Sequence, residues 1–72
     1  MKTMKLMDMK ADYIIEANNY ILDRIPLLDE EQAKLFAGRF YWLQEQFNDD
    51  VINLDEMCTK VGELRNMIAM AL

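Results

Sequence analysis

The sequence predicts an all-α protein of three short helices, arranged as an antiparallel helical hairpin or bundle. Only one proline and two glycines interrupt its 72 residues. Apolar residues recur at the three- and four-residue spacing of amphipathic helices, and the alternation of β-branched residues that is typical of strands is missing. The helices are expected at about residues 8–25, 29–47 and 54–70.

The first helix is expected to end at Ile25. Pro26 disfavours the helical conformation of the residue before it and has no backbone N–H to donate to the preceding turn. Residues 1–7 are expected either to extend this helix or to fray. Residues 1–72 contain no internal repeat or linker, so we expect a single small helical domain.

Capping signals mark the starts of the other two helices. Asp29 is expected to accept hydrogen bonds from the first free amides of the second helix, with Gln32 at the reciprocal position of a capping box. Asn53 and Glu56 repeat this pattern before the third helix. The acidic segment between Glu45 and Glu56 lacks the ligand spacing of a calcium loop, and we interpret it as a solvated capping turn.

The second and third helices each present one apolar stripe. In the second helix this stripe is Phe36, Phe40, Leu43 and Phe47, and in the third it is Leu54, Met57, Val61, Leu64 and Ile68. Small residues flank the third-helix stripe at Cys58, Gly62 and Ala69. We expect this flank to let a neighbouring helix approach closely.

The first helix is apolar over more than half of its circumference, and one neighbouring helix cannot cover that much surface. Its remaining arc forms an acidic ridge of Asp8, Asp12, Glu16, Asn19 and Asp23. Exposed apolar patches of this size usually mark interaction sites. We therefore expect a partner, or a second copy of the chain, to complete the bundle.

The composition excludes several classes of function. A single cysteine and no histidine leave no intrachain disulfide and no ordinary zinc site, and no metal or cofactor is expected. Without histidine, serine or a glycine-rich phosphate loop, the chain is not expected to be an enzyme. Eight basic residues against thirteen acidic ones disfavour direct nucleic-acid binding. No membrane segment or secretion signal is apparent, which favours the cytoplasm.

Aromatic, arginine and methionine side chains beside the stripes are the candidate contact residues. Arg39 and Arg65 border apolar stripes, where they either form interhelical salt bridges or recognise an anionic group. Tyr41 and Trp42 form an edge that either faces a partner or, in the case of Trp42, closes the core. The candidates for partner binding are Tyr13, Tyr20, Arg39, Tyr41, Trp42, Arg65, Met67 and Met70.

The sequence therefore predicts a helical protein–protein interaction module: an adaptor, co-chaperone or inhibitor. Its apolar helix faces would bind another protein or its own copy by helix-in-groove packing. The alternative is a small oligomeric inhibitor, of the kind that viruses or mobile elements encode. Such a protein would sequester an anionic small molecule through its arginines, or act as an acidic decoy for a nucleic-acid-binding protein.

Overall fold

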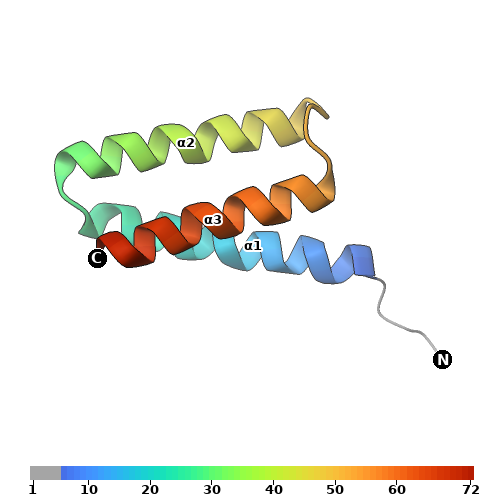
Figure 1. The fold of residues 1–72 in the computed structure, drawn as a ribbon, viewed down its shortest axis with the longest axis horizontal. Coiled ribbons are helices and arrows are strands. Elements are labelled where there is room, and N and C mark those ends of the chain that lie inside the picture. The colour runs from blue at the N-terminus through green and yellow to red at the C-terminus, as the bar shows by residue number, and fades with distance from the viewer. Residues whose placement is uncertain (1–5) are drawn as a thin grey trace.

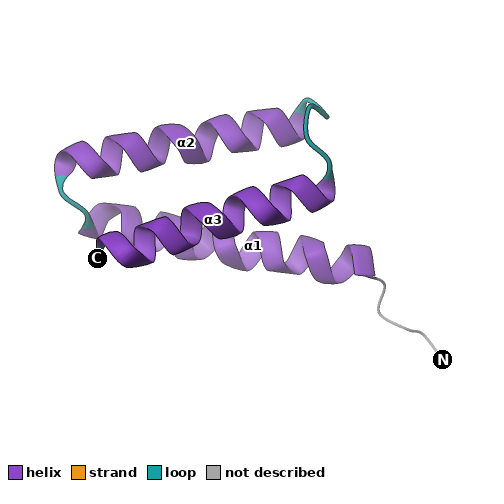
Figure 2. Ribbon diagram, viewed as in Figure 1, coloured by secondary structure: helices purple, strands orange, loops and turns teal. Residues whose placement is uncertain are grey.

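The computed structural model describes residues 6–72 of the chain, with side chains from residue 9 onward. It contains α1 (Leu6–Arg24), a short 3-10 helix η1 (Ile25–Leu27), α2 (Glu30–Asn48) and α3 (Leu54–Ala71) (Figure 2). No strand occurs in this part of the chain. The all-α prediction is confirmed, and the helix bounds lie within two residues of the expected ones.

The three helices form an up-down-up arrangement (Figure 1). Helices α1 and α3 run in the same direction, and α2, which lies between them in the sequence, runs in the opposite direction. Helix α3 contacts both of the others, and its contact with α1 is the more extensive. The central position of α3 leaves a different interface on each of its sides.

Helix α1 ends where the proline predicts. The α-helix stops at Arg24, and Pro26 lies in η1, where the amide of Leu28 donates to the carbonyl of Ile25 at 3.1 Å. Because α1 begins at Leu6, residues 6 and 7 extend the first helix. The expectation for residues 1–5 lies outside the described part of the chain.

The caps of α2 and α3 differ in completeness. The carboxylate of Asp29 accepts from the amide of Gln32 at 2.8 Å, but the side chain of Gln32 does not return the bond, so the expected capping box is only half formed. At α3 the box is complete. Asn53 accepts from the amide of Glu56 at 2.8 Å, and the Glu56 carboxylate accepts from the amide of Asn53 at 3.2 Å. The complete box therefore fixes the backbone at the point where the turn after α2 enters α3.

The core is built from the predicted stripes, the inner face of α1, and Ile52 from the turn between α2 and α3. Phe47 and Leu54, at the α2–α3 end of the stripes, are only half-buried. The buried members are Ile14, Ala17, Ile21, Phe36, Phe40, Leu43, Ile52, Met57, Val61, Leu64 and Ile68.

The small-residue flank of α3 faces α1, which makes the close approach that the sequence predicts for a neighbouring helix. Gly62 is buried beneath the ring of Tyr13, and the Sγ of Cys58 donates to the carbonyl of Lys10 at 3.5 Å. Ala69, at the other end of this flank, is exposed. Glycine permits this approach because a Cβ would occupy the space that the Tyr13 hydroxyl fills.

An amide pair links α1 to α2. The side chains of Asn18 and Gln44 exchange two hydrogen bonds of 3.5 and 3.3 Å, and both residues are partly buried. Mutual pairing satisfies both amide groups at the edge of the core. This polar link fixes α2 relative to α1 without an extensive apolar contact between them.

Candidate docking groove between α2 and α3

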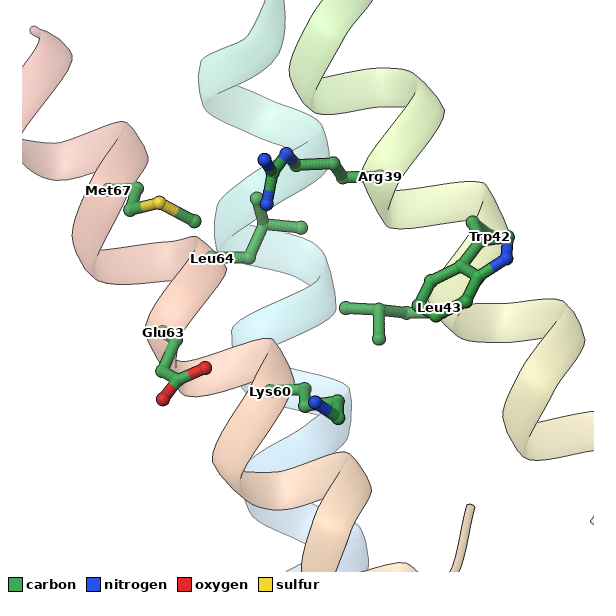
Figure 3. Close-up of a pocket in the computed structure, with 7 residues that line it drawn as sticks. All are labelled: Arg39, Trp42, Leu43, Lys60, Glu63, Leu64 and Met67. Atoms are coloured by element: carbon green, nitrogen blue, oxygen red, sulfur yellow. The ribbon is translucent and has the colours of Figure 1, made fainter. Parts of the chain in front are cut away.

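A hollow of about 120 Å³ opens between α2 and α3 (Figure 3). We call it the groove, and define it by the residues that line it. These are Arg39, Trp42, Leu43, Lys60, Glu63, Leu64 and Met67.

The floor of the groove is apolar, and each wall contributes one large apolar side chain. Leu43 and Leu64 belong to the buried core and form its floor, so the groove opens directly onto the interior of the bundle. Trp42 stands on the α2 side and is 55% exposed, while Met67 on the α3 side is half-buried. A tryptophan with this exposure beside a core leucine presents apolar area that no part of residues 9–72 covers.

Two cations reach over this floor from opposite helices. Arg39 projects from α2 toward Leu64, and Lys60 projects from α3 toward Leu43 (Figure 3). Within the described part of the chain neither cation forms an ion pair, and neither does Glu63, the remaining charged residue of the groove. Two cations and one carboxylate give the groove a local charge of +1, on a chain whose net charge is −5.

Helical periodicity explains how these side chains meet. Arg39 and Trp42 lie three residues apart on one flank of the α2 stripe, and Lys60 and Met67 lie seven apart on one flank of the α3 stripe. When the two stripes pack on each other, the two flanks face each other across the groove. The groove is therefore a by-product of core packing, and its chemistry depends on the flanking residues.

Three of the candidate contact residues come together here: Arg39, Trp42 and Met67. Lys60 and Glu63 were not among the candidates from the sequence. The spacing of seven residues between Lys60 and Met67 was the available signal, because it places both on one side of α3. Of the two alternatives for Trp42, the one in which it closes the core is contradicted, since more than half of its surface is exposed.

Tyr20 and Arg65 lie on the other side of α3, at its contact with α1. The guanidinium carbon of Arg65 lies 4.5 Å from the centre of the Tyr20 ring, and that of Arg24 lies 4.1 Å from it. Such cation–π contacts contribute about 0.5–1 kcal/mol each at partly exposed sites. The salt bridges expected for Arg39 and Arg65 are not formed among residues 9–72. Arg39 lies on the α2 side of α3, and Arg65 lies on its α1 side.

The other three candidate residues lie outside the groove. Tyr13 covers Gly62 at the contact of α1 with α3. The exposed ring of Tyr41 meets that of Phe40 edge to face at a centroid distance of 5.3 Å. Met70, near the end of α3, is 80% exposed.

The acidic turn between α2 and α3 has a structural role. Besides the Asn53 cap, Asp55 forms an ion pair with Lys10 of α1, which ties the start of α3 to the first helix. Asp50 adopts a left-handed backbone conformation with φ of 61°, which an aspartate tolerates better than most residues. Asn53, Glu56 and Asp55 therefore have structural contacts, and Asp50 supplies the backbone conformation of the turn.

Neither a metal-binding cluster nor a membrane-spanning helix occurs in the part of the chain that the structure describes, which for side chains is residues 9–72. No three histidine, cysteine or acidic side chains converge as a metal site would require. Each described helix is too short or too polar to cross a membrane.

Comparison of the chain with protein-family models, with curated proteins and with solved structures found no match. Its function is therefore inferred from the geometry of the groove and from the surfaces around it.

Proposed function

We propose that the chain is a helical protein–protein interaction module, and that the groove between α2 and α3 is its docking site. The observation that carries this proposal is an open apolar floor, Leu43 and Leu64, beneath Trp42 and two cations that lack partners within the described chain. An amphipathic helix laid in such a groove would cover the floor with its apolar face and pair its carboxylates with Arg39 and Lys60.

Trp42, Arg39 and Met67 in the groove are of residue types that are enriched at protein-binding surfaces. Tryptophan and arginine are the residue types most enriched where single side chains dominate binding energy, and methionine adapts to the shape of its partner. Apolar area that a partner covers contributes roughly 25 cal/mol per Å² to the complex. Trp42 and Met67 supply that area on opposite walls, so a bound helix contacts both.

An adaptor, co-chaperone or inhibitor would use this binding mode, and we propose that it acts in the cytoplasm, where the lone Cys58 stays reduced. Catalysis would need a nucleophile or general base in the groove, and the groove contains only Lys60 and Glu63 as titratable groups of that kind.

Photo-crosslinking from inside the groove tests the proposal. A photoreactive phenylalanine analogue at position 42, introduced in cells that naturally produce the protein, is expected to crosslink to a second polypeptide. The same analogue at position 70 is the matched control, because Met70 is also exposed on the bundle surface but does not line the groove. Equal crosslinking from both positions, or none from position 42, would contradict the groove as the docking site.

A further inference from the structure

Helix α1 presents two large apolar side chains to solvent. Ile15 is 57% exposed and Leu22 is 45% exposed. They lie seven residues apart, so they share one side of the helix, about 10.5 Å from each other along its axis. Neither is used in the core, which takes Ile14, Ala17 and Ile21 from α1.

Carboxylates border this apolar pair. Asp12, Glu16 and Asp23, from the acidic ridge, are all exposed and form no ion pair among residues 9–72. We call Ile15, Leu22 and these three carboxylates the α1 strip. It has the properties of a helix that binds a basic, apolar groove: an apolar edge with acidic residues beside it.

The groove offers the complementary pattern. Leu35 and Trp42 are 57% and 55% exposed and lie seven residues apart on the α2 flank that borders the groove, with Arg39 between them. On α3 a cation, Lys60, lies seven residues before Met67. The apolar spacing of the α1 strip therefore repeats on the α2 side of the groove, and the groove as a whole, with Arg39, Lys60 and Glu63, carries a charge of +1 against the three carboxylates of the strip.

Matching spacing and opposite charge are the conditions for packing one helix beside another. Helices with apolar residues every seven positions interlock their side chains along a shared seam, and charges along the edges select partner and orientation. The hollow is also of suitable size. A cavity of roughly 150 Å³ accommodates benzene, which has six carbons. The side chain of leucine or isoleucine has four carbons, so the hollow of about 120 Å³ accommodates one of them.

We infer that the occupant of the groove is the α1 strip of a second copy of this chain, a conclusion that rests on the proposed docking function of the groove. Because the two surfaces differ, each copy contributes one strip and one groove. Copies then join reciprocally in a dimer, in which each strip fills the other's groove, or successively in a ring or chain. The contact brings Asp12, Glu16 and Asp23 of one copy near Arg39 and Lys60 of the next.

Charge reversal tests this pairing through analytical ultracentrifugation between roughly 1 µM and 1 mM protein. The wild type is expected to associate as its concentration rises, and less so in high salt. Two double variants are compared with the wild type: a groove variant, Arg39→Glu with Lys60→Glu, and a strip variant, Asp12→Lys with Glu16→Lys. Each is expected to associate at least about tenfold more weakly than the wild type, because like charges then face each other. All four positions are exposed or at the groove mouth, and circular dichroism checks that each variant keeps its helices.

Mixing the two variants gives the decisive result. In the mixture the acidic groove of one variant faces the basic strip of the other, so an equimolar mixture is expected to associate again, in a 1:1 ratio. Lys34→Glu is the matched control for Arg39→Glu alone, because Lys34 lies on the same helix, is exposed, and does not line the groove. It is expected to leave association unchanged.

The inference that a second copy occupies the groove is overturned if the wild type stays monomeric between roughly 1 µM and 1 mM. It is also overturned if Lys34→Glu weakens association as much as Arg39→Glu does, or if the mixed variants fail to associate. In each case the crosslink from position 42 separates the two proposals. A crosslink to a different polypeptide keeps the groove as a docking site with another partner, whereas no crosslink removes the docking function as well.

Discussion

The hydroxyl oxygen of Tyr13 lies 2.7 Å from the point that a Cβ on Gly62 would occupy. This relationship sets how closely α1 approaches α3. The nearest atom of the Tyr13 ring itself, Cζ, lies 3.6 Å from the same point, which is an ordinary contact distance. The conflict with alanine at position 62 therefore comes from the hydroxyl alone.

Gly62→Ala is expected to give little or no stabilisation in the wild type, because the gain of about 1 kcal/mol in helix propensity is offset by displacing the Tyr13 ring. In a Tyr13→Phe background the obstacle is gone, and the same substitution is expected to raise the free energy of unfolding by about 1 kcal/mol. Urea unfolding of the four proteins measures this coupling. Equal effects in both backgrounds would mean that Tyr13 moves away at no cost.

Gly38→Ala is expected to stabilise the protein by about 0.8–1.0 kcal/mol. Gly38 lies inside α2, and no atom of a neighbouring residue lies within 4 Å of the point that a Cβ would occupy there. Only helix propensity changes, so this substitution calibrates the result at Gly62. A loss of stability on urea unfolding would show that position 38 contacts another chain or segment.

Asn53→Ala is expected to destabilise the protein by about 1 kcal/mol, because it removes the acceptor for the Glu56 amide at the start of α3. In the Asn53→Ala background, Glu56→Ala should lower the free energy of unfolding by less than it does in the wild type, since the capping box is already broken. Asn66→Ala, at an exposed position inside α3, is the matched control and should not destabilise. Thermal unfolding that ranks Asn66→Ala with Asn53→Ala would contradict the cap.

Replacing one member of the Asn18–Gln44 pair is expected to cost more than replacing both. Gln44→Leu leaves the Asn18 amide without its partner at the edge of the core, at a cost of about 1 kcal/mol or more. The double substitution to leucine removes both polar groups and is expected to regain most of that loss. Additive effects in a double-mutant cycle would argue that the two amides do not interact.

Burial raises the pKa of the Cys58 thiol above its usual range; Lys10 opposes this rise and Asp55 adds to it. A raised pKa means that the folded state favours the neutral thiol. Its contribution to stability is complete below the pKa of the unfolded thiol and is lost as the pH rises through the folded pKa. The wild type is therefore expected to lose stability relative to Cys58→Ala at alkaline pH only. Parallel pH profiles of unfolding would contradict this, as would native alkylation rates equal to those in urea.

The sequence by itself determined the number of α-helices, their approximate ends and the inner faces of α2 and α3. These features are local: Pro26 stops α1 whatever surrounds it, and Asn53 with Glu56 starts α3 through bonds within four residues. The apolar spacing that places Met57, Val61 and Ile68 on one side follows from the helical repeat alone. For this reason the core residues of α2 and α3 could be predicted from the sequence, whereas the buried side of α1 and the burial of Ile52 could not.

The tertiary structure decided which neighbour covers each flank. Helical periodicity groups residues on a face but does not say which helix lies against it. Gly62 has no side chain, so α1 packs closely on that flank of α3, and Lys60 and Met67 on the opposite flank are left to face α2. The same arrangement separates Arg39 from Arg65, because α3 packs against α2 on one side and against α1 on the other.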